Sequence, residues 1–461
     1  MNLDDTIVAI ATPAGRGGIG VVRFAGPEAR AIAATMLRQT NSKRLFEADD
    51  FQHTRARFAE LIDSAEGGDC PTRIDEVVVT YFQKPNSYTT DDIVEISAHG
   101  SPVLLRHVLE LALARGARLA EPGEFTMRAF LNGRIDLTQA EAVRDLIESQ
   151  TLYQAKVAAQ QLEGALSHRI QPVKQKLLEL IAVMEAGIDF ADDDVPVAPT
   201  AQIVHAIGRI REPLQELQAS FAYGKVVHQG LTLAIVGRPN VGKSSLFNQL
   251  VERERAIVTA TPGTTRDLIS ETVSIGGIPV RLVDTAGIRH ALDEAESIGI
   301  RKSMEALADA DMVLLVIDGS QALSAEDREL MNDVRVRPSI AVWNKSDLVP
   351  EKERSQCSGI PVSALTGEGI PHLRSELLRT IGADGGGQQE SGFLTNVRHQ
   401  QLVQDAVCGL DRAATAVTAA TPHEMILLDL YAALRSLDEI TGTTTTDDIL
   451  NLIFGSFCIG K

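Results

Sequence analysis

The chain has 461 residues, of which 44% are hydrophobic and 23% are charged, and its formal net charge is −18. This balance excludes a disordered or fibrous protein, and the length predicts about three domains. The negative charge also excludes a protein that binds nucleic acid through its overall surface charge, because the phosphates would be repelled. Nucleic-acid binding would require a local basic patch or a basic partner protein.

The apolar runs are short, and the one at 312–317 is far below the roughly 20 residues that a membrane-spanning helix needs. Residues 1–20 lack the basic and apolar regions of a signal peptide. Neither a metal-binding nor a disulfide spacing is visible among the cysteines, which are Cys70, Cys357, Cys408 and Cys458. We therefore expect a cytoplasmic protein.

Residues 1–130 alternate β-branched runs with glycine and proline. The runs with the composition of strands are 6–13, 19–26, 73–82 and 92–100. Leucines then recur at helical spacing from residue 102 until Gly116, which is a natural helix stop. This pattern predicts a small α+β domain over residues 1–130.

Apolar residues three and four apart, with little glycine or proline, extend from Leu137 to about residue 190. They predict long helices. The segment 191–200 interrupts this pattern, and Thr200 is expected to be the N-cap of the next helix.

Residues 231–380 alternate strand-like and helix-like runs, and helical patterns return after the glycine-rich segment 382–392. We therefore predict one helical domain in two parts, 131–229 and 385–461, that is interrupted by an inserted α/β domain over 230–384. Such insertions are tolerated where two chain ends lie close together at a surface.

The inserted segment contains a phosphate-binding motif. Residues 232–250 read as a strand, a glycine loop and the start of a helix, and Gly237 to Ser244 fit the pattern G-x-x-x-x-G-K-S. In this motif the backbone amides surround phosphates, Lys243 supplies a positive charge and the Ser244 hydroxyl can bind magnesium. A chance match is the alternative, but few chance matches stand between a strand and a helix.

Two further motifs supply groups that can bind the metal ion and the γ-phosphate. The segment 263–267 (GTTRD) offers Thr265 as a second magnesium ligand, and Asp284 at the end of a strand can hold the magnesium shell. The amide of Gly287 can meet the γ-phosphate. Ras-like enzymes have a water-orienting glutamine next, whereas this chain has Ile288, so another arrangement must activate water.

Two later motifs indicate guanine. Asn344, Lys345 and Asp347 follow a strand, and an aspartate carboxylate accepts hydrogens from the ring NH and exocyclic amine of guanine. The loop at Ser363 and Ala364 can offer a backbone amide to the guanine oxygen. Each motif alone is weak, but all five in this order predict GTP binding.

With these motifs, the chain resembles the MnmE (TrmE) family of tRNA-modifying GTPases over its whole length. The matching segments are 11–26, 121–142, 237–246, 263–267, 284–289 and the final 457–461 (FCIGK). The resemblance implies a folate-binding α+β domain that dimerises, a discontinuous all-α domain and an inserted Ras-like P-loop GTPase domain.

The resemblance also implies site residues for GTP hydrolysis. Lys243 and Glu296 are implied as catalytic, although a solvated loop acid is the alternative for Glu296. A potassium ion takes the place of an arginine finger, bound by Asn240, Thr259, Thr261 and Thr264, and magnesium is bound by Ser244 and Thr265. The implied GTP-binding residues are Asn240, Val241, Gly242, Lys243, Ser244, Ser245, Thr259, Thr264, Thr265, Asp284, Thr285, Ala286, Gly287, Asn344, Lys345, Asp347, Ser363, Ala364 and Leu365.

A second site is implied for a tetrahydrofolate derivative, either 5-formyl or 5,10-methylene. Its residues are Arg23, Glu95, Arg134 and Lys461, with Cys458 as a catalytic candidate. Arginines suit the carboxylate tail of a folate and a glutamate suits its pterin ring. The alternatives are surface ion pairs for the charged residues and a buried, inert thiol for Cys458.

In function, the resemblance implies a homodimer that acts with the flavoprotein MnmG (GidA) in a heterotetrameric or larger complex. It would install a carboxymethylaminomethyl or aminomethyl group at carbon five of the wobble uridine in tRNA, which is bound mainly by the partner. The alternative is a Ras-like signalling or assembly GTPase, such as a ribosome-maturation factor. That alternative would give no reason for the folate residues or the FCIGK tail.

Overall fold

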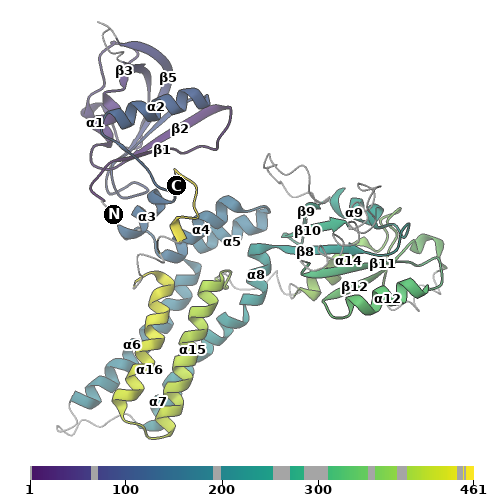
Figure 1. The fold of residues 1–461 in the computed structure, drawn as a ribbon. Coiled ribbons are helices and arrows are strands. Elements are labelled where there is room, and N and C mark those ends of the chain that lie inside the picture. The colour runs from purple at the N-terminus through teal and green to yellow at the C-terminus, as the bar shows by residue number, and fades with distance from the viewer. Residues whose placement is uncertain are drawn as a thin grey trace. The chain divides into compact units, whose positions relative to one another are not determined.

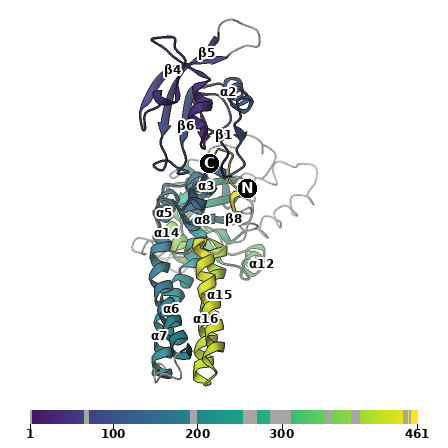
Figure 2. The same cartoon turned by 90° about the vertical axis from the view of Figure 1, so that its left-hand side faces the viewer.

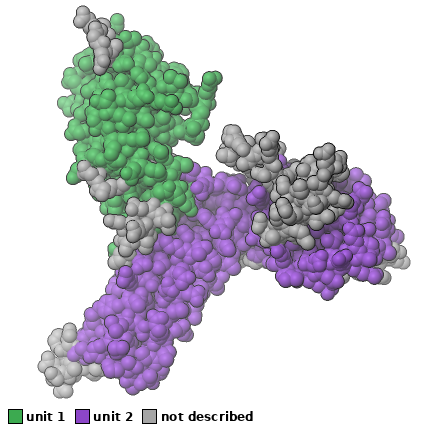
Figure 3. Space-filling view, in the orientation of Figure 1, with its two compact units in different colours: residues 1–144, 441–461 green, residues 145–440 purple. Residues whose placement is uncertain are grey.

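The computed structural model describes residues 3–63, 71–189, 199–252, 270–284, 310–350, 359–381, 392–443, 450 and 453–460. Figure 1 shows the ribbon, and Figure 2 shows it turned by 90°. The chain divides into two compact units, which Figure 3 colours separately. Unit 1 comprises Met1–Arg144 and Thr441–Lys461, and unit 2 comprises Asp145–Ile440.

Unit 1 contains a sheet that has seven strands in its described residues, in the order β3-β4-β5-β6-β2-β1-β7. The strands are β1 (Ile7–Ile10), β2 (Gly17–Ala25), β3 (Leu37–Gln39), β4 (Ala56–Asp63), β5 (Thr72–Phe82), β6 (Ile93–Gly100) and β7 (Arg118–Leu119). Neighbouring strands are antiparallel except β1 and β7, which are parallel. The helical elements are α1 (Ala29–Ala34), η1 (Ala48–Asp50), α2 (Pro102–Ala114), α3 (Glu124–Leu131) and α4 (Leu137–Glu148), of which α4 crosses into unit 2.

The two faces of this sheet are covered by different helices, because side chains along a strand alternate between faces. Val8 of β1 belongs to the core formed with α1 and α2, where Val108 is fully buried. Its neighbours Ile7 and Ala9 point to the opposite face and pack with Phe125 of α3. The strands and helix predicted for residues 1–130 are confirmed, while β3, β4, β7, α1 and α3 are additions that the sequence pattern did not indicate.

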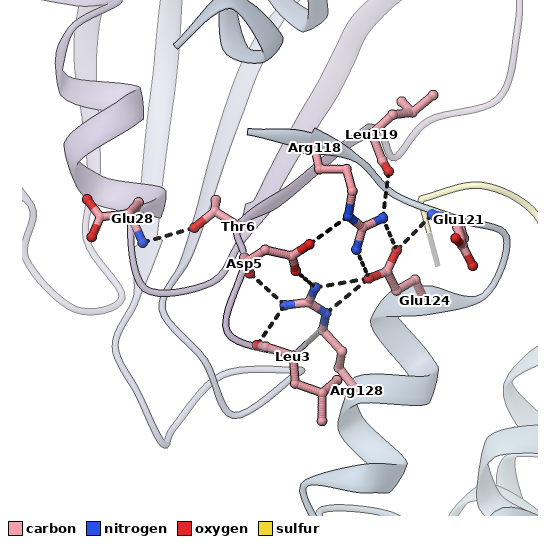
Figure 4. A network of polar contacts seen from close by, with 9 residues as sticks. All are labelled: Leu3, Asp5, Thr6, Glu28, Arg118, Leu119, Glu121, Glu124 and Arg128. Carbon is pink, nitrogen blue, oxygen red and sulfur yellow. Dashed lines mark hydrogen bonds and ion pairs between the residues drawn. The ribbon is translucent and has the colours of Figure 1, made fainter. Parts of the chain in front are cut away.

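A buried ionic network attaches α3 to the sheet (Figure 4). Glu124 and Arg128 of α3 are completely buried and form an ion pair with an N–O distance of 2.9 Å. Arg118 of β7 donates to Glu124 at 2.6 Å and to Asp5 at 2.6 Å, and Arg128 also pairs with Asp5. The orientation of α3 is therefore set by charged groups as well as by Phe125.

Unit 2 contains a helical part and a second sheet. Its helices outside the sheet region are α5 (Leu152–Leu162), α6 (Ala165–Asp189), α7 (Thr200–Ala219), α8 (Phe221–Gln229), α15 (Val397–Thr418) and α16 (His423–Thr441). In both views α6, α7, α15 and α16 run side by side (Figures 1 and 2). Their described side chains share one core, so segments on either side of the inserted sheet belong to one helical body.

Helix α7 shows how the pattern produces this packing. Its buried residues are Ile203, Ile207, Ile210, Leu214 and Leu217, which recur alternately four and three positions apart and so lie on one face. The expected capping role of Thr200 is wrong, because α7 begins at Thr200 and its N-cap is Pro199. Proline lacks a backbone N–H and has a restricted φ, which suits a residue at the edge of a helix.

In the described residues the second sheet has six strands in the order β13-β12-β11-β8-β10-β9. Its strands are β8 (Leu231–Val236), β9 (Ser270–Ile275), β10 (Ile278–Asp284), β11 (Met312–Asp318), β12 (Ser339–Asn344) and β13 (Ile360–Pro361). Its helical elements are α9 (Lys243–Glu252), α12 (Ala325–Val334), η2 (Ser346–Leu348) and α14 (Ile370–Thr380). The pairs are parallel except β10 with β9.

Helices cover both faces of this sheet, as parallel sheets require. Leu246 of α9 and Leu373 of α14 lie in the core on one face, and Val334 of α12 lies in the core on the other. Strand β11 is therefore buried at every position. Because β8, β11 and β12 are parallel neighbours, the loops after their carboxyl ends share one edge of the sheet, where doubly wound folds place ligands.

No helix in the described part of the chain combines the length and the apolar character needed to cross a membrane.

Candidate functional site

The loop that joins β8 to α9, residues 237–244, is called here the phosphate loop. Its backbone takes unusual angles, with φ of 96° at Gly242 and 64° at Asn240. A Cβ atom on Gly237 would lie 2.3 Å from the main-chain oxygen of Val316, and one on Gly242 would lie 2.2 Å from the Asn344 amide nitrogen. Only glycine fits at these two positions, so the glycines allow the loop to pack closely against β11 and β12.

The ammonium group of Lys243 is held inside the phosphate loop. Lys243 is only 7% exposed, and its Nζ donates to the main-chain oxygens of Gly237 at 2.8 Å and Arg238 at 2.7 Å. The loop thus fixes a positive charge beside backbone amides at the start of a helix, an arrangement that attracts phosphate.

Asn344 connects the phosphate loop to the loop after β13. Its side-chain nitrogen donates to the Val241 oxygen at 2.8 Å, and its side-chain oxygen accepts from the Ala364 amide at 2.9 Å. Asn344 is 2% exposed, so both bonds lie in a buried environment where hydrogen bonds are strong. The structure therefore brings together three sequence motifs that are far apart along the chain.

Lys345 is oriented by an acidic residue that the sequence motifs did not indicate. Its Nζ lies 2.7 Å from a carboxylate oxygen of Asp318, at the end of β11. Burial opposes the ionisation of Asp318, but hydrogen bonds from Lys345 and Ser320 outweigh it and lower the pKa of that carboxyl. An acid at the end of a run of apolar residues was the available sequence signal.

The remaining predicted residues of this site occupy the same loops. Asp347 is half-buried in η2, Ser363 is buried, and Leu365 is 83% exposed. The amide of Ser346 donates to the Val362 oxygen at 3.0 Å, which holds the two base-side loops together. In the phosphate loop and the first turn of α9, the side chains of Asn240, Ser244 and Ser245 are exposed.

Several predicted residues lie outside the described residues, namely Thr259, Thr261, Thr264, Thr265, Thr285, Ala286, Gly287, Glu296 and Lys461. For Asp284 the structure describes the backbone, which ends β10. Strand β10 pairs with β8, so Asp284 reaches the edge that carries the phosphate loop.

In unit 1, the predicted folate residues Arg23 and Glu95 face one another on paired strands. They are register partners in β2 and β6, and an Arg23 nitrogen lies 2.8 Å from the Glu95 carboxylate. Any ligand that binds Glu95 must therefore join or displace an existing ion pair. The Arg23 guanidinium also lies over the Phe125 ring, 5.7 Å from its centroid.

Tyr88 contacts the third predicted residue, Arg134. The Arg134 guanidinium lies over the Tyr88 ring at 5.7 Å, and the Tyr88 hydroxyl is 2.9 Å from the Thr126 hydroxyl. Burial raises the pKa of Tyr88, while the charges of Arg23 and Arg134 oppose that rise. Tyr88 was missed by sequence reasoning, since a lone tyrosine in a loop has no distinguishing pattern.

The C-terminal tail packs in the same unit. Ile459 forms a β-bridge with Pro122, and a Cβ on Gly460 would lie 2.5 Å from the Ile10 oxygen. Cys458 is exposed and not in a disulfide, so the alternative of a buried, inert thiol is wrong. The β-bridge at Ile459 holds the backbone of the tail, and the Cys458 side chain that precedes it is exposed to solvent.

Within the described ranges, no group of three or more histidine, cysteine or acidic side chains could hold a metal ion.

Comparison with known proteins decides the family. A family model described as the MnmE helical domain matches residues 137–458, and one described as the GTP-binding protein TrmE N-terminus matches residues 6–134. The tRNA modification GTPase MnmE of Koribacter versatilis is 65% identical over 465 residues, which cover 100% of both chains. The chain belongs to the MnmE family of tRNA modification GTPases.

A second relative, MnmE of Aquifex aeolicus, is 43% identical and covers 99% of this chain and 100% of its own. Among solved structures, the G domain of the T. maritima FeoB iron transporter is 24% identical and covers 32% of this chain and 98% of its own. Its TM-score is 0.25.

Membership of the MnmE family confirms the multidomain α+β and α/β fold class and a GTPase that acts in tRNA modification. It decides against the alternative of a signalling or assembly GTPase, because both family models and full-length relatives cover the N-terminal and helical parts.

Proposed function

We propose that this GTPase hydrolyses GTP to GDP and phosphate and, as a homodimer with a flavoprotein of the MnmG type, modifies carbon five of the wobble uridine in tRNA. The added group would be carboxymethylaminomethyl or aminomethyl, with one carbon from a tetrahydrofolate. We also propose a cytoplasmic location, where such a tRNA substrate is found. The bond from Asn344 to Val241 carries the nucleotide part of this proposal, because it joins a base-side loop to a phosphate-side loop.

The chain's own residues account for nucleotide binding. Lys243 would neutralise phosphate charge, and the adjacent backbone amides would hold phosphate oxygens. The carboxylate of Asp347 would accept two hydrogens from guanine, which adenine cannot supply. The Ala364 amide donates to Asn344 and so fixes this loop, and a neighbouring main-chain amide of the loop would donate to the guanine oxygen.

The residues present fit the implied metal ions. The Ser244 hydroxyl is exposed next to Lys243 and offers an oxygen of the kind that magnesium prefers. Asn240 is exposed in the phosphate loop, and its amide oxygen suits a monovalent cation. When bound, the two cations would neutralise charge that develops on the phosphates during hydrolysis.

The polar groups of unit 1 fit a folate. The charges of Arg23 and Arg134 both act on Tyr88 and would match an anionic tail, while Glu95 and the aromatic rings would match a flat, donor-rich pterin. The proposed domains are a folate-binding domain at 1–130, a helical domain at 131–229 and 385–461 and a GTPase domain at 230–384.

The test is complementation of a bacterial strain that lacks its own member of this family. Mass spectrometry of digested tRNA should show the modified wobble uridine when the chain is expressed, and should show its loss with Glu95→Gln. A matched control is Glu121→Gln, because Glu121 is an exposed acid of the same unit. Unmodified uridine in the strain that expresses the unaltered chain would contradict the proposed function.

A further inference from the structure

Arg238 lies in the phosphate loop, but its side chain is directed away from that loop's lysine and toward α12. Its Nε donates to a carboxylate oxygen of Asp327 at 2.7 Å. Asp327 stands in the first turn of α12, and its side chain is 2% exposed while that of Arg238 is 21% exposed. A buried carboxylate of this kind is stable only with a charged or hydrogen-bonding partner.

The second oxygen of Asp327 is held by α12 itself. It accepts from the Ser324 amide at 3.0 Å and from the Ser324 hydroxyl at 2.8 Å, and that hydroxyl accepts from the Asp327 amide at 3.1 Å. This capping box engages the Asp327 oxygen that Arg238 does not bond, so the cap and the Arg238 contact use separate oxygens of one carboxylate. Burial raises the pKa of Asp327, but the bonds from Arg238 and Ser324 outweigh burial and lower it.

Helix α12 is in turn fixed to the sheet. Its residues Leu330 and Met331 pack in the cluster that contains Val334, Leu315 and Ile317, which joins α12 to β11. The carboxylate that holds Arg238 is therefore mounted on a rigid element, as positioning groups require.

The backbone of Arg238 takes part in the phosphate loop. Its main-chain oxygen accepts from Lys243 Nζ at 2.7 Å. The same residue thus contacts the phosphate-side lysine through its main chain and α12 through its side chain. A shift of Arg238 would move an oxygen that orients the Lys243 ammonium group.

We propose that Arg238 and Asp327 are a positioning pair, which anchors the rim of the phosphate loop to α12 and so holds Lys243 in place for guanine nucleotide. This inference rests on the proposed nucleotide function. A purely structural alternative is that Asp327 only caps α12 and Arg238 only covers its charge.

The experiment compares four variants of the full chain. Arg238→Met keeps the aliphatic stem, Asp327→Asn keeps the shape, the double variant removes both charges, and Ser324→Ala weakens the cap but leaves the Arg238 contact. The measurements are the dissociation rate of methylanthraniloyl-GDP in stopped flow and the thermal unfolding midpoint without nucleotide.

Either single charge variant should release the nucleotide about five-fold faster or more, because a charge-assisted hydrogen bond is lost. The double variant should be no faster than the singles, since the two residues act as one unit. Ser324→Ala should lower the unfolding midpoint without changing the dissociation rate.

An unchanged dissociation rate in Arg238→Met, or equal acceleration by Ser324→Ala, would overturn the positioning role. Fully additive effects in the double variant would also overturn it. If the unaltered chain does not retain methylanthraniloyl-GDP, or retains the adenine analogue equally well, the proposed nucleotide function fails and this inference fails with it.

Discussion

The side-chain amide of Asn344 donates a hydrogen bond of 2.8 Å to the main-chain oxygen of Val241, which is 103 residues away in sequence. A Cβ on the next residue, Gly242, would clash with that same amide nitrogen. The loop after β12 and the phosphate loop are therefore parts of one packed structure, and a change at either should alter the other.

Asn344→Asp tests this connection directly. The substitution places a carboxylate oxygen against the Val241 oxygen in a buried site, so the two acceptors repel and remain unsatisfied. We expect a loss of about 2–3 kcal/mol in GDP binding free energy, measured by calorimetry. Asn332→Asp, at an exposed position of α12, is the control and should bind normally. Equal GDP affinity in Asn344→Asp and the unaltered chain would show that the connection is not used.

Asp347→Asn should change base preference. The amide presents one donor where guanine requires acceptors, so GTP affinity should fall by roughly 2–3 kcal/mol and xanthosine triphosphate should become the better ligand. Competition binding with both nucleotides measures the shift. Asp333→Asn removes an equal charge from an exposed site on α12 and should leave base preference unchanged. Unaltered GTP affinity in Asp347→Asn would mean that another residue reads the base.

GTP hydrolysis should depend on potassium. If Asn240 is a ligand of a monovalent cation, the hydrolysis rate should rise several-fold when sodium is replaced by potassium, because the cation neutralises transition-state charge. Asn240→Ala should remove this response while nucleotide binding is largely kept. Asn248→Ala, which removes an exposed amide from α9, should respond like the unaltered chain. Identical rates in both salts would contradict a potassium role.

The ionic network around α3 should make unit 1 sensitive to acid. Burial raises the pKa values of Asp5 and Glu124, but hydrogen bonds from Arg118 and Arg128 outweigh it and lower both below their ordinary 3.8 and 4.5. Carboxyls with lowered pKa values stabilise the fold fully above about pH 5, and the stabilisation is lost as the pH falls through those values. Hydrogen exchange of β1 and α3 should therefore accelerate selectively on acidification.

Glu124→Gln tests the same network at neutral pH. It leaves two arginines, Arg118 and the buried Arg128, with Asp5 as the acid that they share, so we expect a loss of about 3–5 kcal/mol in the unfolding free energy of unit 1. The control is Glu121→Gln, because Glu121 is exposed and contributes its backbone amide to the network. Similar hydrogen exchange of α3 in the two variants would show that the buried pair contributes little.

The single tryptophan reports on the second sheet. Trp343 packs in the same cluster as Leu330 and Met331 of α12. Because side chains alternate along β12, Trp343 lies on the opposite face of the strand from Asn344. Its fluorescence emission should be blue-shifted relative to exposed indole and should change only modestly when GDP binds. Strong quenching by GDP would place the ring in the nucleotide site and contradict this geometry.

The base-reading residues and the domain bounds stay predictions, whereas the sequence alone was sufficient for the strand, glycine loop and helix start of residues 231–252 and for the long apolar helices. These features are local, since glycines at fixed spacing, a lysine at a helix start and runs of apolar residues act through near neighbours. The short elements β3, β4 and α1 escaped prediction, because three to eight residues with mixed polarity carry little periodic signal.

Tertiary structure alone decided which distant side chains meet. The bond from Asn344 to Val241 and the one from Arg238 to Asp327 depend on parallel strands lying in the order β12-β11-β8, which no local pattern specifies. Likewise, Arg23 and Glu95 are 72 residues apart and meet because β2 pairs with β6 in one particular register. Side-chain contacts across a sheet follow from strand order and register, and these are set by the packing of the whole unit.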